Sequence, residues 1–548
     1  MKIMGNNKSR RGPAKGLWRA LAVTACLVTW AWPLAAQVSH GGTPLYGPHA
    51  KGEVATFQAT PVDAAALLRQ DMELAQSGDP LRVGETRRLD IDVTRQGTRL
   101  PQHDGSVVYR CRVVCEGATY LSLTFGTFQL PQGATLFCYD AAGRAVIGSF
   151  VGADTLAGGA FYTQALPGGV AYIEYREPRE AVGRGVLRLA DVTAGYKDLF
   201  HTFKGLLGDD GGCSPDVACD AGKDWCRQIH SVACYTVRIG GFTYICTGAL
   251  INNTKHDRTP YFLSANHCQE NGTVTQWTFY FNYEASECEG TDGPVDHSLT
   301  GATILAKRNK DVGSDFLLLR LAQDVPESYD PYWAGWDLND DLTVGCCVHH
   351  PAGDVKKISI PKTLALSQGQ GGQFIRADWD NHGITEGGSS GSPLFNKSGL
   401  IVGQLLGGTS SCTNTFGYDL YGRISKSWTG GGTQDTRLKD WLDPGNSGVK
   451  TLAGCGAEKA CGSLDPVPAE TLSAYPNPTR DVLHVAANDS GSATYYVYAM
   501  DGRLMRTGPL SFTPAEQSIS LAGLRSGAYY VEVLVGEKRY HHIVVVSR

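Results

Sequence analysis

Short runs of alternating apolar and polar residues, separated by Gly and Pro, recur along most of this 548-residue chain. An alternation with a period of two puts one face of a strand against a core and the other in solvent, so these runs predict β-strands. Clear examples lie at residues 88–93, 106–114, 120–125 and 171–175. Because charged residues make up only 19 % and the chain contains 67 Gly, we expect an all-β dominated, loop-rich globular protein rather than a disordered or coiled one.

The chain is too long for one typical domain, since domains average about 150 residues. Residues 37–204 contain predicted strands but no cluster of chemically active side chains, so we predict a β-rich accessory region or propeptide there. Residues 205–445 hold every motif that could do chemistry and are predicted to form the working domain. A linker at 446–470 and a small β-sandwich at 471–548 complete the predicted order.

The N-terminus has the features of an export signal. Six basic residues are followed by an apolar run at 20–32, and Ala35 and Ala36 then offer a cleavage site, so we predict a signal peptide at residues 1–36. A membrane anchor is the competing interpretation, but about 13 apolar residues are too few for a bilayer core that needs about 20. A lipoprotein signal through Cys26 is a second alternative, which the apolar run continuing past Cys26 disfavours.

Cysteine number and charge limit the chemistry further. Removal of the signal peptide takes away Cys26 and leaves 15 of the 16 Cys, so we expect most of them to form disulfides outside the cytoplasm, with at least one left over. No paired Cys-x-x-Cys knuckle or His-Glu-x-x-His helix indicates zinc, and we expect no metal or other cofactor. A net charge of -5 offers no basic surface for nucleic acid or for an acidic membrane.

Short strings supply the parts of an acyl-transfer site, which needs a nucleophile, a base, a group that orients the base and donors for an oxyanion. In the string 387–393 (GGSSGSP), glycines allow a tight turn that exposes Ser390 as the nucleophile. The amides of Gly388 and Ser390 would then form the oxyanion hole. His267 ends the apolar string 261–267 and is the candidate base, because an ordinary histidine pKa of about 6.5 suits proton transfer near neutral pH.

A third string puts Asp315 directly before an apolar strand at 316–319. A buried carboxylate without a partner would be costly there, and the imidazole of His267 would compensate it. Taken singly, each string also fits a structural explanation: an ordinary Gly/Ser turn, a structural histidine or a turn-capping aspartate. The order His, Asp, Ser is that of chymotrypsin-like enzymes and not of subtilisins or α/β-hydrolases, so together the strings predict a serine endopeptidase.

The segment from about Cys213 to Pro444 resembles the bacterial lysyl endopeptidases of the chymotrypsin-like clan, through further strings at 333–337 (WAGWD), 349–351 (HHP) and 440–444 (DWLDP). The resemblance implies a chymotrypsin-like double β-barrel protease domain that is made as a zymogen. It also implies three disulfides: Cys213 to Cys412, Cys219 to Cys288 and Cys246 to Cys268. Outside this pattern, and without an assigned partner, are Cys226, Cys234, Cys346 and Cys347.

The same resemblance implies cleavage after lysine, with Asp419 as the pocket carboxylate that pairs with the substrate ammonium. A surface aspartate is the competing interpretation, and a roomy pocket would also admit arginine. The family type enzyme has a histidine and a tryptophan stacked beside the pocket. Here Leu406 stands at the histidine position, and no Trp lies between Pro361 and Phe374. We therefore do not carry over the pH profile and rate of that enzyme. Trypsin-like or glutamyl specificity on the same triad is the alternative within this class.

Maturation and export are implied in the same way. Family precursors mature by cleavage after lysine, and Lys204-Gly205 precedes Cys213 in a Gly-rich stretch, so we predict self-cleavage there.

The tail at 471–548 resembles the sorting domain of the type IX secretion pathway, through the string 475–478 (YPNP) and a basic, apolar ending. We expect a secreted or cell-surface monomer, exported through the periplasm of a Gram-negative bacterium, without a membrane span after signal removal. Its expected partners are that secretion machinery and protein or peptide substrates, and a non-catalytic secreted adhesin is the alternative of another class.

Overall fold

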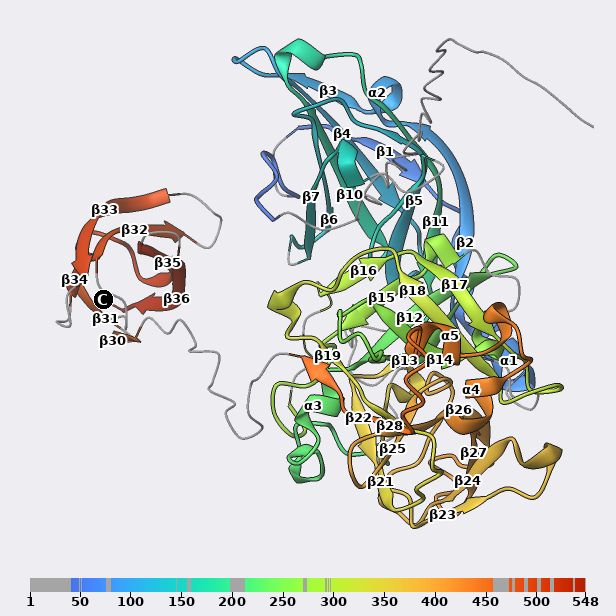
Figure 1. Cartoon of the computed structure of the whole chain (residues 1–548). Helices are drawn as coiled ribbons and strands as arrows, with labels where there is room; N and C mark the ends of the chain where they lie inside the picture. The colour runs from blue at the N-terminus through green and yellow to red at the C-terminus, as the bar shows by residue number, and fades with distance from the viewer. Residues whose placement is uncertain are drawn as a thin grey trace, which may run out of the picture.

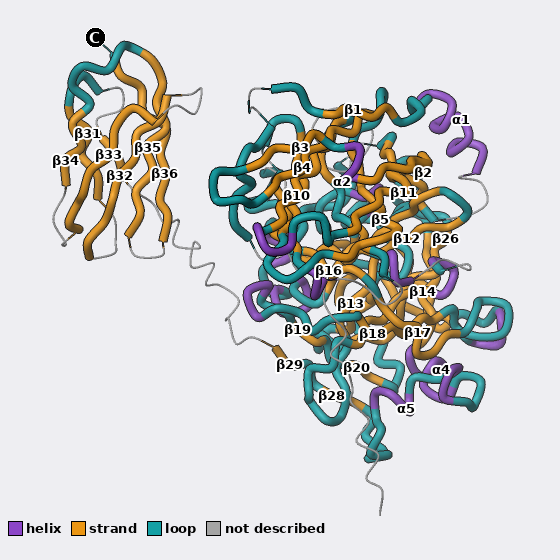
Figure 2. The backbone as a smooth tube through the Cα atoms, turned by 90° about the horizontal axis from the view of Figure 1, so that it is seen from above, coloured by secondary structure: helices purple, strands orange, loops and turns teal. Residues whose placement is uncertain are grey.

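The computed structural model describes most of the chain from residue 41 to residue 547 (Figure 1). It leaves out residues 49, 51, 75–79, 144, 155–158, 198–211, 270–273, 291, 292, 294, 296, 457–472, 476–478, 487–490, 500–503, 513–516, 536 and 537. The predicted signal peptide and the predicted cleavage site Lys204-Gly205 therefore lie outside the described residues. Strands dominate the described chain (Figure 2), which confirms the predicted all-β dominated class.

Two sheets form the N-terminal region. The first has the order β1-β4-β10-β6-β7 with β3 beside β4, and its strands are β1 (Ala55–Gln58), β3 (Thr98–Pro101), β4 (Val107–Val114), β6 (Thr135–Asp140), β7 (Val146–Phe150) and β10 (Val170–Glu177). The second contains β2 (Leu81–Asp92), β5 (Tyr120–Gln129), β8 (Phe161–Tyr162), β9 (Leu166–Pro167) and β11 (Val186–Gly195). Val113 and Ile173 of the first sheet share one buried cluster with Leu123 and Leu187 of the second, so the two sheets pack face to face.

Strand β2 carries the second of these sheets into the central region, residues 212–456. Within a twelve-stranded sheet, β2 lies between β11 and β13, and its antiparallel register places Glu85 opposite Phe242 and Leu81 opposite Ile245. Figure 1 shows β2 running from the N-terminal region to the strands of the central one. The central strands of this sheet are β12 (Val232–Ile239), β13 (Phe242–Leu250), β14 (Tyr261–Ala265), β15 (Thr278–Phe281), β16 (Ser298–Thr300), β17 (Ala302–Lys307) and β18 (Phe316–Leu321).

The central region adds a nine-stranded sheet, and the two sheets agree with the predicted pair of β-barrels. Its strands are β20 (Trp336–Asp337), β21 (Val344–His349), β22 (Lys357–Ser359), β23 (Thr363–Leu366), β24 (Phe374–Asp378), β25 (Pro393–Asn396), β26 (Ile401–Gly408), β27 (Tyr418–Arg423) and β28 (Thr451–Leu452). A separate pair consists of β19 (Tyr332–Trp333) and β29 (Cys455–Gly456). Since β28 pairs with β20 and β29 with β19, the first part of the predicted linker packs on the central region.

The tail forms its own two-sheet unit around Leu483, Val497, Val531 and Val544. Its strands are β30 (Ser473–Tyr475), β31 (Val482–Ala486), β32 (Gly491–Ala499), β33 (Leu504–Phe512), β34 (Gln517–Ser520), β35 (Gly527–Val535) and β36 (Lys538–Val546). The α-helices are short: α1 (Ala64–Leu74), α2 (Val93–Gln96), α3 (Cys226–Ile229), α4 (Ile424–Thr429) and α5 (Lys439–Leu442). Among the described residues, none of the helices combines the length and the apolar character needed to cross a membrane.

Three disulfides lie in the central region, and they join the pairs that the resemblance implied: Cys213–Cys412, Cys219–Cys288 and Cys246–Cys268. Cys226 is also disulfide-bonded. The sequence led us to expect disulfides for most cysteines, but seven of the described ones are free thiols: Cys111, Cys115, Cys138, Cys234, Cys346, Cys347 and Cys455. Burial raises the pKa of each of these thiols, so they behave as small core side chains rather than as bridge formers.

Candidate active site

The junction of β14 and β18 brings two of the predicted residues together. Strand β14 ends at Ala265 and continues into a tight turn, Asn266–Cys268, which carries His267. Asp315 directly precedes β18, whose first residue, Phe316, lies opposite Ala265 in the antiparallel register. His267 and Asp315 are therefore neighbours, and His267 Nδ1 is 2.6 Å from Asp315 Oδ2.

The protein backbone holds the carboxylate of Asp315 in one position. The side chain is 1 % exposed, its Oδ1 accepts a hydrogen bond of 3.2 Å from the amide of His267, and its carbonyl accepts one of 2.8 Å from the amide of Asn266. Asp315 has a φ of 57°, a left-handed conformation that costs about 1–3 kcal/mol for a residue with a side chain. Such strain persists only where the surroundings fix it, and here it accompanies a carboxylate aimed at the imidazole.

The carboxylate also selects the tautomer of His267. Because Asp315 is an acceptor, it favours the neutral imidazole with its proton on Nδ1, which leaves a lone pair on Nε2. His267 Nε2 is buried and has no hydrogen-bond partner among the described residues. A buried acceptor without a partner is costly in a purely structural role, but it is what a general base needs.

Ser390 lies in the turn that precedes β25, between two glycines with positive φ, Gly388 at 95° and Gly391 at 84°. A Cβ at Gly391 would lie 2.0 Å from Ser264 Oγ, so only glycine fits there. The amide of Thr247 donates a hydrogen bond of 2.8 Å to the carbonyl of Ser390. The turn is thereby fixed to the C-terminal half of β13.

The Cys246–Cys268 disulfide connects this turn to the candidate base. Cys268 directly follows His267, and its Sγ lies 3.8 Å from the carbonyl oxygen of Ser390. Within the described chain, no hydrogen bond joins the Ser390 hydroxyl to His267 Nε2. The amides of Gly388 and Ser390 donate to no other described residue, so both are available to an oxyanion.

Asp419, on β27, is 1 % exposed and is surrounded by neutral donors. Its Oδ2 accepts hydrogen bonds from Trp379 Nε1 (2.7 Å), Thr385 Oγ1 (2.6 Å) and Ser410 Oγ (2.5 Å). Burial raises the pKa of this carboxyl and the three hydrogen bonds oppose the rise. A Cβ at Gly408 would lie 2.5 Å from Asp419 Oδ1, so glycine keeps the space beside that oxygen open.

Sequence reasoning pointed to Asp419 but missed its three donors. Trp379 follows β24, Thr385 lies in the loop before the nucleophile turn, and Ser410 follows β26. They come from separate segments, and only the folded sheet brings them to one carboxylate. The family resemblance pointed to a Trp between residues 361 and 374, where none occurs. Trp379 lies a few residues later and supplies the indole donor to Asp419.

The N-terminal region reaches the nucleophile turn directly. Leu81, the first residue of β2, lies opposite Ile245 of β13. A Cβ added at Gly387 would lie 3.5 Å from Leu81 Cβ, and one added at Gly388 would lie 3.4 Å from Leu81 Cδ2. Leu81 therefore packs against the backbone that carries the candidate oxyanion hole.

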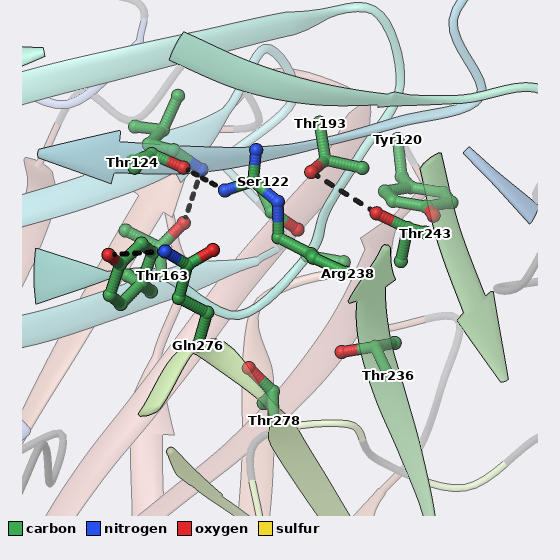
Figure 3. Close-up of a pocket in the computed structure, with 13 residues that line it drawn as sticks. Tyr120, Ser122, Thr124, Thr163, Thr193, Thr236, Arg238, Thr243, Gln276 and Thr278 are labelled. Atoms are coloured by element: carbon green, nitrogen blue, oxygen red, sulfur yellow. Dashed lines mark hydrogen bonds between the residues drawn. The ribbon is translucent and has the colours of Figure 1, made fainter. Parts of the chain in front are cut away.

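Polar side chains line a pocket in another part of the contact between the N-terminal and central regions (Figure 3). Arg238 of β12 donates to Thr124 Oγ1 (2.7 Å) and pairs with Asp191 Oδ1 (2.8 Å), both in the N-terminal region. Gln276 donates to the hydroxyl of Tyr162 across the same contact (2.8 Å). The contact combines these polar pairs with an apolar cluster, in which Val83 and Tyr120 pack with Ile245 and Tyr280.

Two parts of the chain match known family models. Residues 207–422 match the model described as "Lysyl endopeptidase, C-terminal domain", and residues 473–547 match "Secretion system C-terminal sorting domain". His267, Asp315, Ser390 and Asp419 all lie within the first match. The chain is also 28 % identical over 414 residues to a lysyl endopeptidase of Pseudomonas aeruginosa, which covers 69 % of this chain and 86 % of that protein.

Two solved structures of proteases resemble part of the chain. One is the thermostable serine protease AL20 from an extremophilic microorganism, with 13 % identity and a TM-score of 0.29 over 36 % of this chain and 92 % of that chain. Another is protease Anisep of Arthrobacter nicotinovorans, with 16 % identity and a TM-score of 0.28 over 35 % of this chain and 90 % of that chain.

Proposed function

We propose that this secreted serine endopeptidase hydrolyses peptide bonds on the carboxyl side of lysine, with Ser390 as nucleophile, His267 as general base and Asp315 as the residue that orients the base. The 2.6 Å contact between His267 Nδ1 and Asp315 Oδ2, beside the glycine turn of Ser390, carries the proposal. The lysyl endopeptidase match over residues 207–422 supports it, since all three residues lie within that range.

In the proposed reaction, the Ser390 hydroxyl attacks the carbonyl carbon of the substrate while His267 Nε2 takes up the hydroxyl proton. Asp315 keeps the imidazole in the required tautomer and stabilises the imidazolium that forms. The amides of Gly388 and Ser390 donate to the developing oxyanion, where each donor is worth about 2.7–4 kcal/mol. His267 then gives its proton to the leaving amine, and water repeats the sequence on the acyl-enzyme.

Lysine specificity is proposed to rest on the carboxylate of Asp419, which forms no ion pair with any described residue. A lysine ammonium reaching Asp419 would neutralise a buried negative charge, whereas a neutral side chain would leave that charge without a partner and a glutamate would add a second one. The three donors on Oδ2 fix the orientation of the carboxylate and leave Oδ1 to face the substrate. This arrangement supports lysine over the glutamyl alternative.

The N-terminal region is proposed to keep the enzyme latent as a propeptide. Its strand β2 occupies the edge of β13, and Leu81 lies against the backbone of the candidate oxyanion hole. Arg82, which is 5 % exposed, holds this segment in place through hydrogen bonds to Asp71 (2.9 Å) and to the hydroxyl of Tyr196 (3.1 Å). A substrate would have to displace β2 to use this edge, so removal of the region is the proposed activation step, with Lys204-Gly205 as the proposed cleavage site.

Export is proposed to use the tail. Residues 473–547 match a secretion system sorting domain, which supports a secreted or cell-surface protein that is delivered by the type IX machinery across the outer membrane. Removal of residues 471–548 should therefore stop export while leaving activity in cell extracts. Normal export of the truncated chain would refute this part of the proposal.

The function is tested by mapping the cleavage products of a denatured protein mixture by mass spectrometry, with the matured enzyme and its Ser390→Ala variant side by side. We expect cuts after lysine that disappear in the variant. Cuts after another residue would retain the triad and overturn the role of Asp419. An absence of cuts, together with no labelling of Ser390 by a fluorophosphonate, would overturn the enzymatic function in favour of a binding protein.

A further inference from the structure

We propose that His349 is a positioning residue that holds the loop 384–390 in the shape required at both of its ends, by the nucleophile turn and by the specificity pocket. The proposal rests on the proposed function of these two ends. His349 is the last residue of β21 and is fully buried beneath the loop. Its two ring nitrogens bond in opposite directions, one towards each end.

One nitrogen of His349 fixes the nucleophile end. Nδ1 lies 2.8 Å from the hydroxyl of Ser389, which is fully buried and directly precedes Ser390. The same Ser389 hydroxyl accepts a hydrogen bond of 3.2 Å from the amide of Glu386. The orientation of the peptide that carries the Ser390 amide is therefore set by the contact between Ser389 and His349.

The other nitrogen fixes the pocket end. Nε2 lies 2.9 Å from the hydroxyl of Ser359, which is buried on β22. Ser359 Oγ in turn donates a hydrogen bond of 2.9 Å to the carbonyl of Ile384. Thr385, the next residue, donates to Asp419. A single imidazole thus connects the loop that bears the oxyanion donors to the loop end that orients the pocket carboxylate.

The direction of each proton in this network follows from the acceptors. Ser359 uses its one hydrogen on the Ile384 carbonyl, so His349 Nε2 donates to Ser359, and in a neutral ring Nδ1 then accepts from Ser389. Only the neutral imidazole satisfies both contacts. Burial, reinforced by the nearby Lys357, lowers the pKa of His349 to about 3, so the imidazole stays neutral at any pH where the enzyme would work.

The adjacent His350 provides a matched control. It is equally buried, but its Nδ1 bonds to the carbonyl of Asp354 (3.0 Å) and its ring lies parallel to that of Tyr283. Its side chain forms no hydrogen bond to the loop 384–390 among the described residues. Replacing His350 therefore tests the effect of disturbing a buried histidine, while replacing His349 tests the loop.

The experiment compares four variants of the full-length precursor after maturation: Ser389→Ala, Ser359→Ala, His349→Leu and the control His350→Gln. The concentration of active sites is counted by fluorophosphonate titration, so that kcat refers to folded enzyme only.

A displacement of about 1 Å at the reacting groups lowers the reaction rate by about 100-fold. We therefore expect Ser389→Ala to lower kcat by about 10- to 100-fold with KM changed less than about twofold. Ser359→Ala should instead raise KM for a lysyl substrate at least about fivefold while kcat changes less than about threefold. His349→Leu should do both.

This separation of kcat from KM is what a merely structural role would not produce. If Ser389→Ala keeps the kcat of the parent enzyme, or if His349→Leu and His350→Gln change both constants equally, the inference is wrong. Should His349→Leu fail to fold, the two serine variants still decide the outcome. Failure of the unmodified enzyme to react at Ser390 would instead overturn the proposed function, so the two failures are distinguishable.

Discussion

Lowering the pH from 7 to 5 should destabilise the central region through two histidines that cannot take up protons while folded. Burial lowers the pKa of His349 and of His350 to about 3 from the ordinary value of 6.5. Lys357 strengthens the effect on His349, and Lys356 strengthens it on His350. Between pH 6.5 and pH 3 the unfolded chain binds more protons than the folded one. Stability from the neutral imidazoles is therefore fully present above pH 6.5 and is lost as the pH falls through this window.

The expected magnitude follows from these values. At pH 5 an unfolded imidazole is almost fully protonated, whereas the folded one remains neutral. Each histidine should therefore lower the free energy of unfolding by about 2 kcal/mol between pH 7 and pH 5, and the pair by about 4 kcal/mol. A loss of this size is a large fraction of the stability of an ordinary domain.

The assay is guanidinium unfolding of the Ser390→Ala precursor, which can neither mature nor digest itself, followed by tryptophan fluorescence at both pH values. Addition of His350→Gln should make the loss between pH 7 and pH 5 about 2 kcal/mol smaller, because one titrating group is gone. His382→Gln is the control, since His382 is exposed in the same region. Equal pH dependence of the His350→Gln and His382→Gln proteins would refute the reasoning.

Three further substitutions test the candidate active site and the contact between the N-terminal and central regions. Asp315→Asn should lower kcat by about 10⁴-fold with little change in KM, measured on a lysyl substrate, because an amide stabilises the wrong tautomer of His267. Asp419→Ser should lower kcat/KM for the same substrate by about 10²- to 10³-fold, because it removes the partner of a buried ammonium, while fluorophosphonate labelling of Ser390 continues. Arg238→Ala should release the cleaved N-terminal region about tenfold more readily in gel filtration, since it loses hydrogen bonds that cross the interface.

Much of the candidate site could be predicted because its parts are local in sequence. His267 ends a strand, Asp315 precedes one, and Ser390 sits in a glycine turn, so short strings were enough to indicate each. The antiparallel register of β14 and β18 then brings His267 to Asp315. Asp419 could be found only through the family resemblance, since nothing in its own neighbourhood marks it as a pocket residue.

The supporting residues could not be predicted, because each acts through a segment distant in sequence. His349 belongs to the string 349–351 (HHP) that supports the family resemblance. Its proposed positioning role depends on Ser359 and Ser389, which lie 10 and 40 positions away in the sequence. No local pattern distinguishes a buried histidine that bridges two hydroxyls from one that fills a core, as His350 shows. The distinction exists only once the strands have placed the acceptors.

The contact between the N-terminal region and the nucleophile turn could not be predicted from the sequence for a different reason. The alternating pattern predicted a strand at 88–93, but β2 begins at Leu81, and its partner is β13 of the next region. Pairing along a strand edge uses backbone N–H and C=O groups, which every residue except proline offers, so the choice of partner leaves little trace in the side chains. What the sequence does contain is the anchor: Arg82 is buried against Asp71 and Tyr196, and it fixes where β2 begins. If exposed side chains of the proposed propeptide are replaced while this anchor is retained, the backbone pairing between β2 and β13 should therefore persist.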